Sequence, residues 1–363
     1  MELPTIQTPQ PEAKRTAILD LSVNQLREWF AERDQPVLRV KQVRRWLVEV
    51  GVQSFDQMTD LPKALRLELN ENFALFGNSV ARHLTANDNT HKLLVKLPDE
   101  KLVECVLIQD GGRRTACIST QVGCGMGCVF CASGLNGVER NLTVGEILEQ
   151  LLRLRNIPRP AGDKSERLSH IVVMGMGEPL ANLDALVEVL DIATAKTGLG
   201  MSARHITIST VGLPPKIRRL ADLGKQYHLA VSLHAPNDDL RTEIVPTNVK
   251  TGISDILDAA QYFFNKTGRQ VTYEYVLLRE LNDRPQHARE LARLLRGRGA
   301  HVNLIPFNNV DGLPYHRPTQ EAQTVFVNTL RSAGISVKVR KRKGSEIDAA
   351  CGQLRRKVAE QLA

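Results

Sequence analysis

Three cysteines fall within eight residues of this chain, and their spacing is its strongest chemical signal. Cys124, Cys128 and Cys131 form a C-x3-C-x2-C loop within residues 121–134. Thiolates this close together can hold one corner of an iron–sulfur cube, which usually takes four protein ligands, so one iron would stay open to another molecule. Glycines between the cysteines allow sharp turns around such a cluster. The alternatives are a zinc site that lacks its fourth ligand, or buried thiols, although structural zinc usually uses paired C-x2-C units.

Length and composition set the broad class of the protein. With 363 residues, 42% of them apolar, the chain can form one large domain and one small one. No stretch is long and apolar enough to cross a bilayer, and the first residues contain no apolar signal region, so we expect a cytoplasmic protein with reduced cysteines. A net charge of +8 weakly favours an anionic partner such as nucleic acid. Aromatic residues make up only 4%, which argues against extended base stacking.

The N-terminal part predicts a small helical domain. Residues 1–16 are rich in proline and polar residues, and we expect them to be disordered. Ser22 and Gln25 form a capping-box pattern at the start of a first helix. Two further helices are predicted at 39–48 and 62–73, completing a domain over 17–78. Its basic outer face is either a solvated surface or a contact for RNA phosphates.

Next comes a β-hairpin over residues 79–114, followed by strands that alternate with helices. Strands are predicted at 115–120, 171–174, 205–209, 229–233, 271–278, 301–306 and 336–340, and helices at 143–156, 182–196, 214–223, 253–265, 284–296 and 320–333. This alternation predicts a parallel sheet. About six units are too few to close an eight-fold barrel, so we expect an open, partial (β/α)6-type barrel over 115–345 and a tail over 346–363. The site should lie at the C-terminal ends of the strands.

Small polar residues do follow these predicted strands. Gly177 allows close backbone approach, and Glu178 could accept a hydrogen bond from a ligand ammonium group, although an ordinary loop is the alternative. Four more polar side chains follow the later strands: Ser209, Ser232, His234 and Asn308. A lone histidine is more often a core residue, but four polar groups at one barrel mouth suit a polar cofactor.

The other three cysteines differ in their surroundings. Cys117 lies in the strand before the cysteine loop, and Cys105 is predicted to be a buried strand residue. Cys351 follows the last strand, so its segment can return to the barrel mouth, and small neighbouring residues would leave its sulfur accessible. Taken alone, Cys351 would be read as an incidental surface thiol.

A family resemblance changes that interpretation. The cysteine loop after a strand, together with Gly-Glu-Pro at 177–179, resembles the radical S-adenosylmethionine (SAM) superfamily. Met-Gly-Met-Gly-Glu-Pro, Ser-Leu-His-Ala-Pro-Asn and Ile-Asp-Ala-Ala-Cys-Gly-Gln-Leu resemble the radical SAM adenine-C2 methyltransferases of 23S ribosomal RNA and tRNA, over roughly residues 20–354. A sister group that methylates C8 of the same adenine shares the cysteines, but Gly-Glu-Pro-Leu and Ala-Pro-Asn-Asp are closer to the C2 group.

The resemblance implies a cofactor set and its ligands. A [4Fe-4S] cluster would be held by Cys124, Cys128 and Cys131, and its open iron would be chelated by the amino and carboxylate groups of SAM. The cofactor-binding residues implied are Gly177, Glu178, Ser209, Ser232, Leu233, His234 and Asn308.

The resemblance also implies a mechanism that uses two SAM molecules per turnover. Cys351 would take a methyl group from one SAM, and a radical generated from the second SAM would remove a hydrogen from that methyl group. The carbon radical would add to C2 of adenine, and Cys117 would then attack the sulfur of Cys351, forming a disulfide and releasing the methylated base. Glu104 occupies the family's acid/base position; the alternative is a solvent-facing strand residue.

The implied partners are 23S rRNA, with tRNA as a further candidate, and an electron donor of the flavodoxin or ferredoxin type. The protein is expected to be a monomer in the cytoplasm. The basic helical domain and the run Arg340-Lys-Arg-Lys343 are candidates for contacting the RNA backbone. Two other functions are considered: C8 methylation, and a non-catalytic RNA-binding protein with a structural zinc ion.

Overall fold

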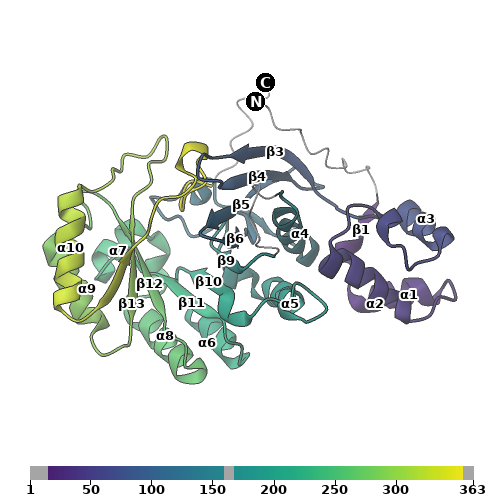
Figure 1. Ribbon diagram of the computed structural model, residues 1–363. Helices are drawn as coiled ribbons and strands as arrows, with labels where there is room; N and C mark the ends of the chain where they lie inside the picture. Colours follow the sequence, from purple (N-terminus) through teal and green to yellow (C-terminus); the bar gives the residue numbers. More distant parts are fainter. Residues whose placement is uncertain (1–14, 159–166, 355–363) are drawn as a thin grey trace.

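A ten-stranded mixed sheet organises the structure. The computed structural model describes residues 15–158 and 167–354, and its strand order is β14-β13-β12-β11-β10-β9-β6-β5-β4-β3 (Figure 1). The strands from β6 to β14 pair in parallel. Their bounds are β6 (Arg113–Cys117), β9 (His170–Val173), β10 (Ile206–Thr210), β11 (His228–Ser232), β12 (Thr272–Leu277), β13 (His301–Pro306) and β14 (Ser336–Val339).

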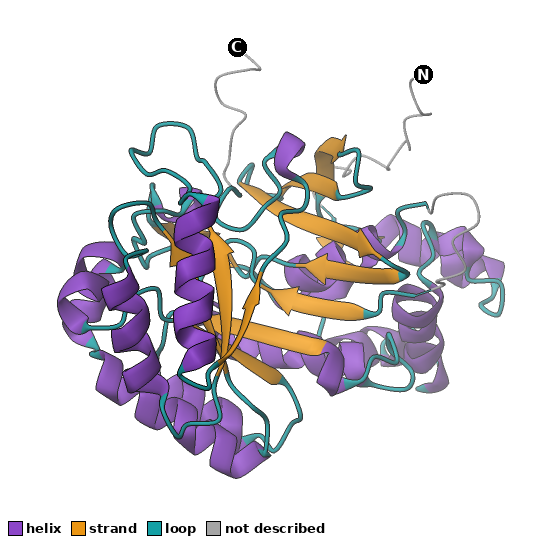
Figure 2. Ribbon diagram, turned by 60° about the vertical axis from the view of Figure 1, so that its left-hand side comes forward, coloured by secondary structure: helices purple, strands orange, loops and turns teal. Residues whose placement is uncertain are grey.

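One long helix connects each parallel strand to the next. These helices are α4 (Val144–Arg155), α5 (Leu183–Thr194), α6 (Pro214–Asp222), α8 (Ile253–Thr267), α9 (Pro285–Leu295) and α10 (Gln320–Ser332). They lie along the outer face of the curved sheet (Figure 2). Apolar side chains of strands and helices form a continuous core that extends into the N-terminal helices. The predicted fold class, an open partial barrel of six strand–helix units, is confirmed.

The predicted hairpin is part of this same sheet. Strands β3 (Ser79–Thr85), β4 (His91–Lys96) and β5 (Leu102–Asp110) pair antiparallel, and β5 pairs with β6. The extension therefore has three strands where the sequence suggested two. Strand β3 lacks a buried face, so its residues show no apolar alternation. Because β5 continues the sheet beside β6, side chains from the extension can reach the barrel mouth.

The N-terminal helical domain is formed by α1 (Val23–Ala31), α2 (Leu38–Arg44) and α3 (Lys63–Asn72), closed by pairing of β1 (Thr16–Ala17) with β2 (Phe73–Ala74). Residues 1–14, predicted to be disordered, lie outside the described residues. The Ser22–Gln25 capping box is present. The second predicted helix continues from α2 as a π-helix, Arg45–Val50. On its basic face Lys41 is exposed, whereas Arg45 forms ion pairs with Glu49 and Asp60.

Helix α4 fixes this domain against the barrel. The Asp20 carboxylate accepts hydrogen bonds from the hydroxyl of Thr143 (2.6 Å) and the N–H of Gly145 (3.1 Å) at the start of α4. Further along, the buried carboxylate of Glu149 accepts from the N–H of Gly77 at 3.0 Å. The domain is therefore held in a defined position beside the sheet. Among the described residues, no helix is long and apolar enough to span a membrane.

Two short elements were not predicted from the sequence. Strands β7 (Gln121–Gly123) and β8 (Val138–Asn141) form a separate hairpin that encloses the cysteine loop. Helix α7 (Asp238–Ile244) follows β11 and packs beside that loop, where the carbonyl of Ile244 accepts from the N–H of Val129 at 3.1 Å. Elements this short have too few residues to show an apolar period.

Histidines gather at the opposite, N-terminal ends of the parallel strands. His170 and His205 stack with ring centroids 4.7 Å apart, and the guanidinium of Arg269 donates to the ring of His228. Burial, followed by the charge of Arg269, lowers the pKa of His228 below its usual value. Folding therefore favours the neutral form of the His228 ring.

We expect this histidine to make stability depend on pH. A group whose pKa is lowered on folding stabilises the protein fully above its unfolded pKa of about 6.5, and this contribution is lost as pH falls below that value. His228→Gln keeps a hydrogen-bond acceptor but cannot titrate. Between about pH 7.5 and pH 5.5, the wild type should lose up to about 1 kcal/mol more free energy of unfolding than the variant, measured by urea titration. Equal losses would contradict this assignment.

Candidate active site

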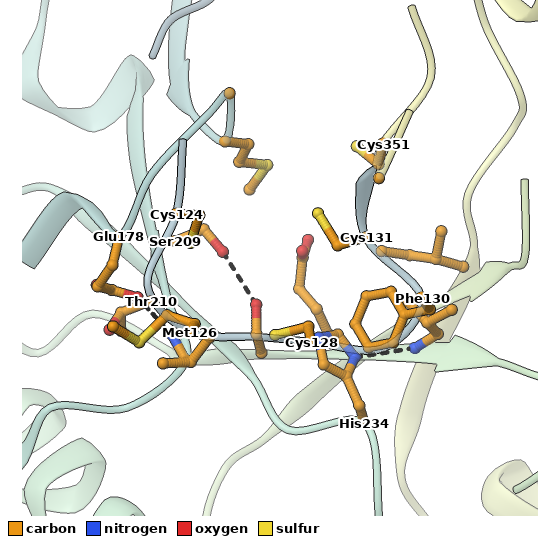
Figure 3. A pocket seen from close by; sticks show the side chains of 18 of the residues that line it. Cys124, Met126, Cys128, Phe130, Cys131, Glu178, Ser209, Thr210, His234 and Cys351 are labelled. Atoms are coloured by element: carbon orange, nitrogen blue, oxygen red, sulfur yellow. Dashed lines mark hydrogen bonds between the residues drawn. The ribbon is translucent and has the colours of Figure 1, made fainter. Parts of the chain in front are cut away.

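The cysteine loop lies at the C-terminal ends of the parallel strands and is held by its own backbone. The N–H of Cys124 donates to the carbonyl of Gly137 at 2.9 Å, and the N–H of Cys131 to that of Cys128 at 3.1 Å. All three thiols of the loop border one cavity of about 130 Å³ (Figure 3). Burial raises the pKa of each, that of Cys124 to about 12. These thiols need a nearby cation if they are to ionise.

The arrangement of these thiols fits an iron–sulfur cluster. All three border one cavity. An iron–sulfur cube has irons that are ligated one at a time by separate thiolates, and three thiols facing a common cavity suit that requirement. Among the described residues, no group of three or more His, Cys, Asp or Glu side chains is placed to hold a single metal ion.

The loop after β9 packs tightly against the segment that leads into the cysteines. Gly177 has φ +102°, and a Cβ there would lie 2.7 Å from the Cβ of Gln121. The side chain of Gln121 accepts from the N–H of Glu178 at 2.8 Å. Only glycine at 177 allows the two segments this close, so this residue sets the distance between the cysteine loop and the Glu178 side chain.

Glu178 is a buried carboxylate that joins two loops. It accepts from the N–H of Leu180 (3.0 Å) and from that of Val211 (2.9 Å), which follow β9 and β10. Burial raises its pKa, and the backbone donors oppose that rise. Glu178 also borders the cavity, so its carboxylate combines a structural role with a position open to a ligand.

The polar groups predicted at later strand ends converge on the same cavity. The hydroxyls of Ser209 and Ser232 lie 3.3 Å apart, and both residues border the cavity together with His234 and Asn308. The amide of Asn308 donates to the carbonyl of Cys351 at 3.1 Å. Leu233 differs from them: it is fully buried, and its N–H donates to the carbonyl of Glu274 at 3.0 Å.

His234 has an unusual backbone and a fixed protonation state. Its φ is +61°, and its Nδ1 accepts from the N–H of Val276 at 3.1 Å. Burial, then the charge of Arg241, lowers its pKa to about 3, so the ring is neutral and carries its proton on Nε2. Phe130 packs against the ring edge-to-face, with centroids 4.8 Å apart. The histidine thus offers one oriented donor at the barrel mouth.

Cys351 lies between this cavity and a second one of about 110 Å³. Residues 345–354 return to the barrel mouth, as the sequence predicted, and Cys351 lies near Cys131 (Figure 3). Cys117 borders the second cavity. Burial, then the neighbouring Cys351, raises the pKa of the Cys117 thiol to about 12. Both thiols that the sequence singled out beyond the cysteine loop therefore face one space. Cys105 is fully buried, as predicted.

Glu104 lies inside the protein. It is 4% exposed, so the alternative of a solvent-facing strand residue is wrong. Its carboxylate pairs with the ammonium of Lys92 at 2.9 Å. In the sheet register Val106 pairs with both Lys92 and Cys117, which places these residues and Glu104 on the same face.

Comparison with known proteins places the chain in a family. A family model described as "Radical SAM superfamily" matches residues 118–295, and one described as "Ribosomal RNA large subunit methyltransferase N-terminal domain" matches 16–75. The chain is 54% identical to "Probable dual-specificity RNA methyltransferase RlmN" of Rhodopirellula baltica, over 99% of this chain and 97% of that protein. It is 45% identical to the protein of that name from Alkaliphilus oremlandii, over 94% and 97%.

A solved structure agrees. The "radical SAM methyltransferase from Sphaerobacter thermophilus" is 43% identical, with a TM-score of 0.89, over 94% of this chain and 99% of that chain. This chain belongs to the RlmN family. Membership in the radical SAM superfamily implies a [4Fe-4S] cluster and SAM as cofactors. The family resemblance drawn from the motifs is confirmed.

Glu274, at the RlmN-family site, was not singled out from the sequence, and Arg340 was singled out only as a candidate for contacting the RNA backbone. Glu274 borders the first cavity, and its carboxylate accepts from the amide of Asn303 at 3.1 Å. Arg340 lies 3.8 Å from Glu274, and its pKa is raised by the neighbouring Cys351 and then by Glu274. Glu274 lies in the middle of a strand, so only its charge within an apolar run could have drawn attention to it.

The close packing at Gly177 can be tested against a glycine with similar backbone and free space. At Gly297 φ is +75°, and nothing lies within 4 Å of an added Cβ. Gly297→Ala should cost about 1–2 kcal/mol of stability, from backbone strain alone. Gly177→Ala adds the clash with Gln121 and should cost about 3 kcal/mol or more, measured by urea unfolding of the reconstituted proteins. It should also lower the bound iron per chain; equal costs and equal iron would refute this packing role.

Proposed function

We propose that this protein is a radical SAM methyltransferase that methylates C2 of a specific adenine in 23S rRNA, and of an adenine in tRNA. The observation that carries the proposal is the position of Cys351 between two cavities. One cavity is bordered by Cys124, Cys128 and Cys131, and the other by Cys117. A methyl group carried on Cys351 would therefore have a radical source on one side and a resolving thiol on the other.

The target atom explains why a methyltransferase would use such a site. C2 of adenine lies between two ring nitrogens and is electron-poor, so it cannot attack the electrophilic methyl group of SAM. When bound, the cluster and SAM supply a radical that removes a hydrogen atom, which makes a methyl carbon reactive toward such a position. The protein must then hold the methyl group, the radical source and the base in line.

We assign the steps to residues as follows. The thiolate of Cys351 takes the methyl group of one SAM by displacement, and a second SAM is consumed to activate that methyl group, giving two SAM molecules per turnover. The carbon radical bonds to C2, and the adduct then loses the proton on C2, which Glu104 accepts, and one electron, which the bound cluster would accept. The thiolate of Cys117 attacks the sulfur of Cys351, so that a disulfide forms and the bond from Cys351 to the bridging methylene carbon breaks. The electron pair of that bond stays on the carbon, which takes up a proton to become the methyl group of the released base.

Cofactor contacts are assigned by the same geometry. Cys124, Cys128 and Cys131 would hold the cluster, and Gly177 and Glu178 would receive the amino group of SAM. Ser209, Ser232, His234 and Asn308 border the same cavity and would contact the remaining polar groups. Leu233 would contribute through its backbone, because its side chain is buried. Electrons would come from a donor of the flavodoxin or ferredoxin type.

Charge around the second cavity supports an RNA substrate. Its border includes Arg317, Arg340, Lys341, Arg342 and Lys343. Basic side chains at this density suit the phosphates on either side of a flipped nucleotide, since the base must leave its stack to reach a barrel mouth. The curated relatives bear the name dual-specificity RNA methyltransferase, which supports action on more than one RNA.

The decisive experiment is mass spectrometry of nucleosides from 23S rRNA and from tRNA, incubated separately with reconstituted protein, SAM and a reductant. We expect 2-methyladenosine in both RNAs. 8-Methyladenosine would instead indicate that the protein methylates C8, as the sister group does. If neither product forms while SAM is cleaved, the result supports the radical chemistry and rejects the proposed substrate.

Replacing Cys351 and replacing Cys117 should block the reaction at different steps. Cys351→Ala removes the methyl acceptor, so RNA methylation should fall below detection while the absorbance of the cluster is retained. Cys117→Ala leaves the acceptor but removes the resolving thiol, so protein and RNA should accumulate as a covalent adduct. Denaturing gel electrophoresis with labelled RNA detects that adduct. Methylation by Cys351→Ala at a normal rate would refute the methyl-cysteine route.

A further inference from the structure

A single buried ammonium group connects the acid/base residue to the segment that carries Cys351. The Nζ of Lys92 lies 2.9 Å from Oε1 of Glu104 and donates to the carbonyl oxygen of Asp348 at 3.2 Å. The side chains of Lys92 and Glu104 are only 9% and 6% exposed. Asp348 lies just before the Ala349-Ala350-Cys351 turn and has φ +50°, a conformation that L residues rarely adopt.

Stability alone does not account for this ion pair. Lys and Glu are almost never buried unless they are paired, and a buried pair is often no more stable than apolar residues of the same size. Here the neighbouring positions on β4 and β5 are apolar and buried, so an apolar pair would fit the core. The geometry adds a second contact, to the carbonyl of Asp348, which an ordinary ion pair within the hairpin would lack.

The backbone around Glu104 is fixed independently of Lys92. The hydroxyl of Ser119 donates to the carbonyl of Glu104 at 2.6 Å, and the N–H of Glu104 points to the sulfur of Met176 at 3.4 Å. The main chain is thus tied to the loops around the barrel mouth, whereas the carboxylate is oriented by Lys92. Removing the ammonium should therefore disturb the carboxylate and the tail while leaving β5 in place.

We propose that Lys92 is a positioning residue that couples Glu104 to the Cys351 segment: it orients the carboxylate of Glu104 on the sheet face that carries Cys117 and holds the Cys351 segment closed over the barrel mouth. This rests on the function proposed above for Glu104 and Cys351. One side chain then ensures that the proton acceptor is in place only when the methyl-bearing thiol is also in place.

The test compares Lys92→Met with Lys92→Arg and with Lys96→Met as the matched control. Lys96 ends the same strand, is 41% exposed, and forms its ion pair with Glu100 rather than with Glu104 or the tail. Lys92→Met should lower kcat for RNA methylation by about tenfold or more, with little change in KM for RNA. Lys92→Arg, which keeps donors for both acceptors, should recover most of that loss, and Lys96→Met should match the wild type.

Coupling to Glu104 is measured with a double-mutant cycle. Because part of the effect of Lys92 runs through Glu104, Lys92→Met combined with Glu104→Gln should be slowed by clearly less than the product of the two single losses. If instead the two losses multiply, the positioning role is overturned. Lys92→Met removes one partner of a buried ion pair and should lower the melting temperature, so all assays are run well below the melting temperature of each variant. Retained cluster absorbance then ensures that folded holoenzymes are compared.

Coupling to the tail is measured by hydrogen exchange, which needs no RNA activity. The N–H of Ala349 donates to the carbonyl of Gly344 at 2.9 Å within the closed segment. Lys92→Met should speed exchange across 344–354 by about tenfold, and Lys96→Met should not. Unchanged exchange would overturn the tether even if methylation fell. If wild-type protein does not methylate RNA, the proposed function fails, while the exchange result still decides whether the tether exists.

Discussion

The docking of residues 345–354 onto the barrel mouth is the interaction on which the site depends. The N–H of Ala132, next to the cysteine loop, donates to the carbonyl of Gly352 at 2.8 Å. The amide of Asn308 and the hydroxyl of Ser133 donate to the carbonyls of Cys351 and Leu354. These bonds hold backbone groups and leave the thiol of Cys351 uncommitted. Without these bonds, Cys351 would not be held between the two cavities that it now borders.

Burial disfavours ionisation of the thiols at this site, and a neighbouring charged side chain counteracts that effect. Thiols in both cavities have raised pKa values because burial disfavours their ionised forms. The guanidinium of Arg340 opposes this effect at Cys351 and at Cys117, while the carboxylate of Glu274 offsets the charge of Arg340 itself. The guanidinium of Arg340 thus favours ionisation of both thiols, which are proposed to react one after the other. The raised pKa values keep both thiols largely un-ionised, and an un-ionised thiol is a poor nucleophile.

The sequence predicted the parts of this protein that depend on local pattern. The strand–helix alternation predicted the open barrel, and the capping box predicted at Ser22 is present. The C-terminal strand ends carry the polar residues expected there because parallel strands converge at one edge. What could not be predicted depends on contacts between distant segments. For Glu104 the sequence allowed two interpretations, an acid/base residue or a solvent-facing strand residue, because alternation alone does not say which face of the extension is covered. In the structure the sheet continues past β6, and the tail covers the face that carries Glu104.

The antiparallel extension is therefore more than a linker between the helical domain and the barrel. A partial barrel leaves one edge strand unpaired, and an exposed edge invites association with other chains. Strands β5, β4 and β3 move that edge outward and at the same time provide a wall for the tail, where the side chain of Asp88 accepts from the N–H of Gly344 at 3.0 Å. The carboxylate of Glu346 in turn accepts from Asn87. The same strands then supply Glu104 and Lys92, so the covering of the edge and the proposed chemistry rest on one structural element.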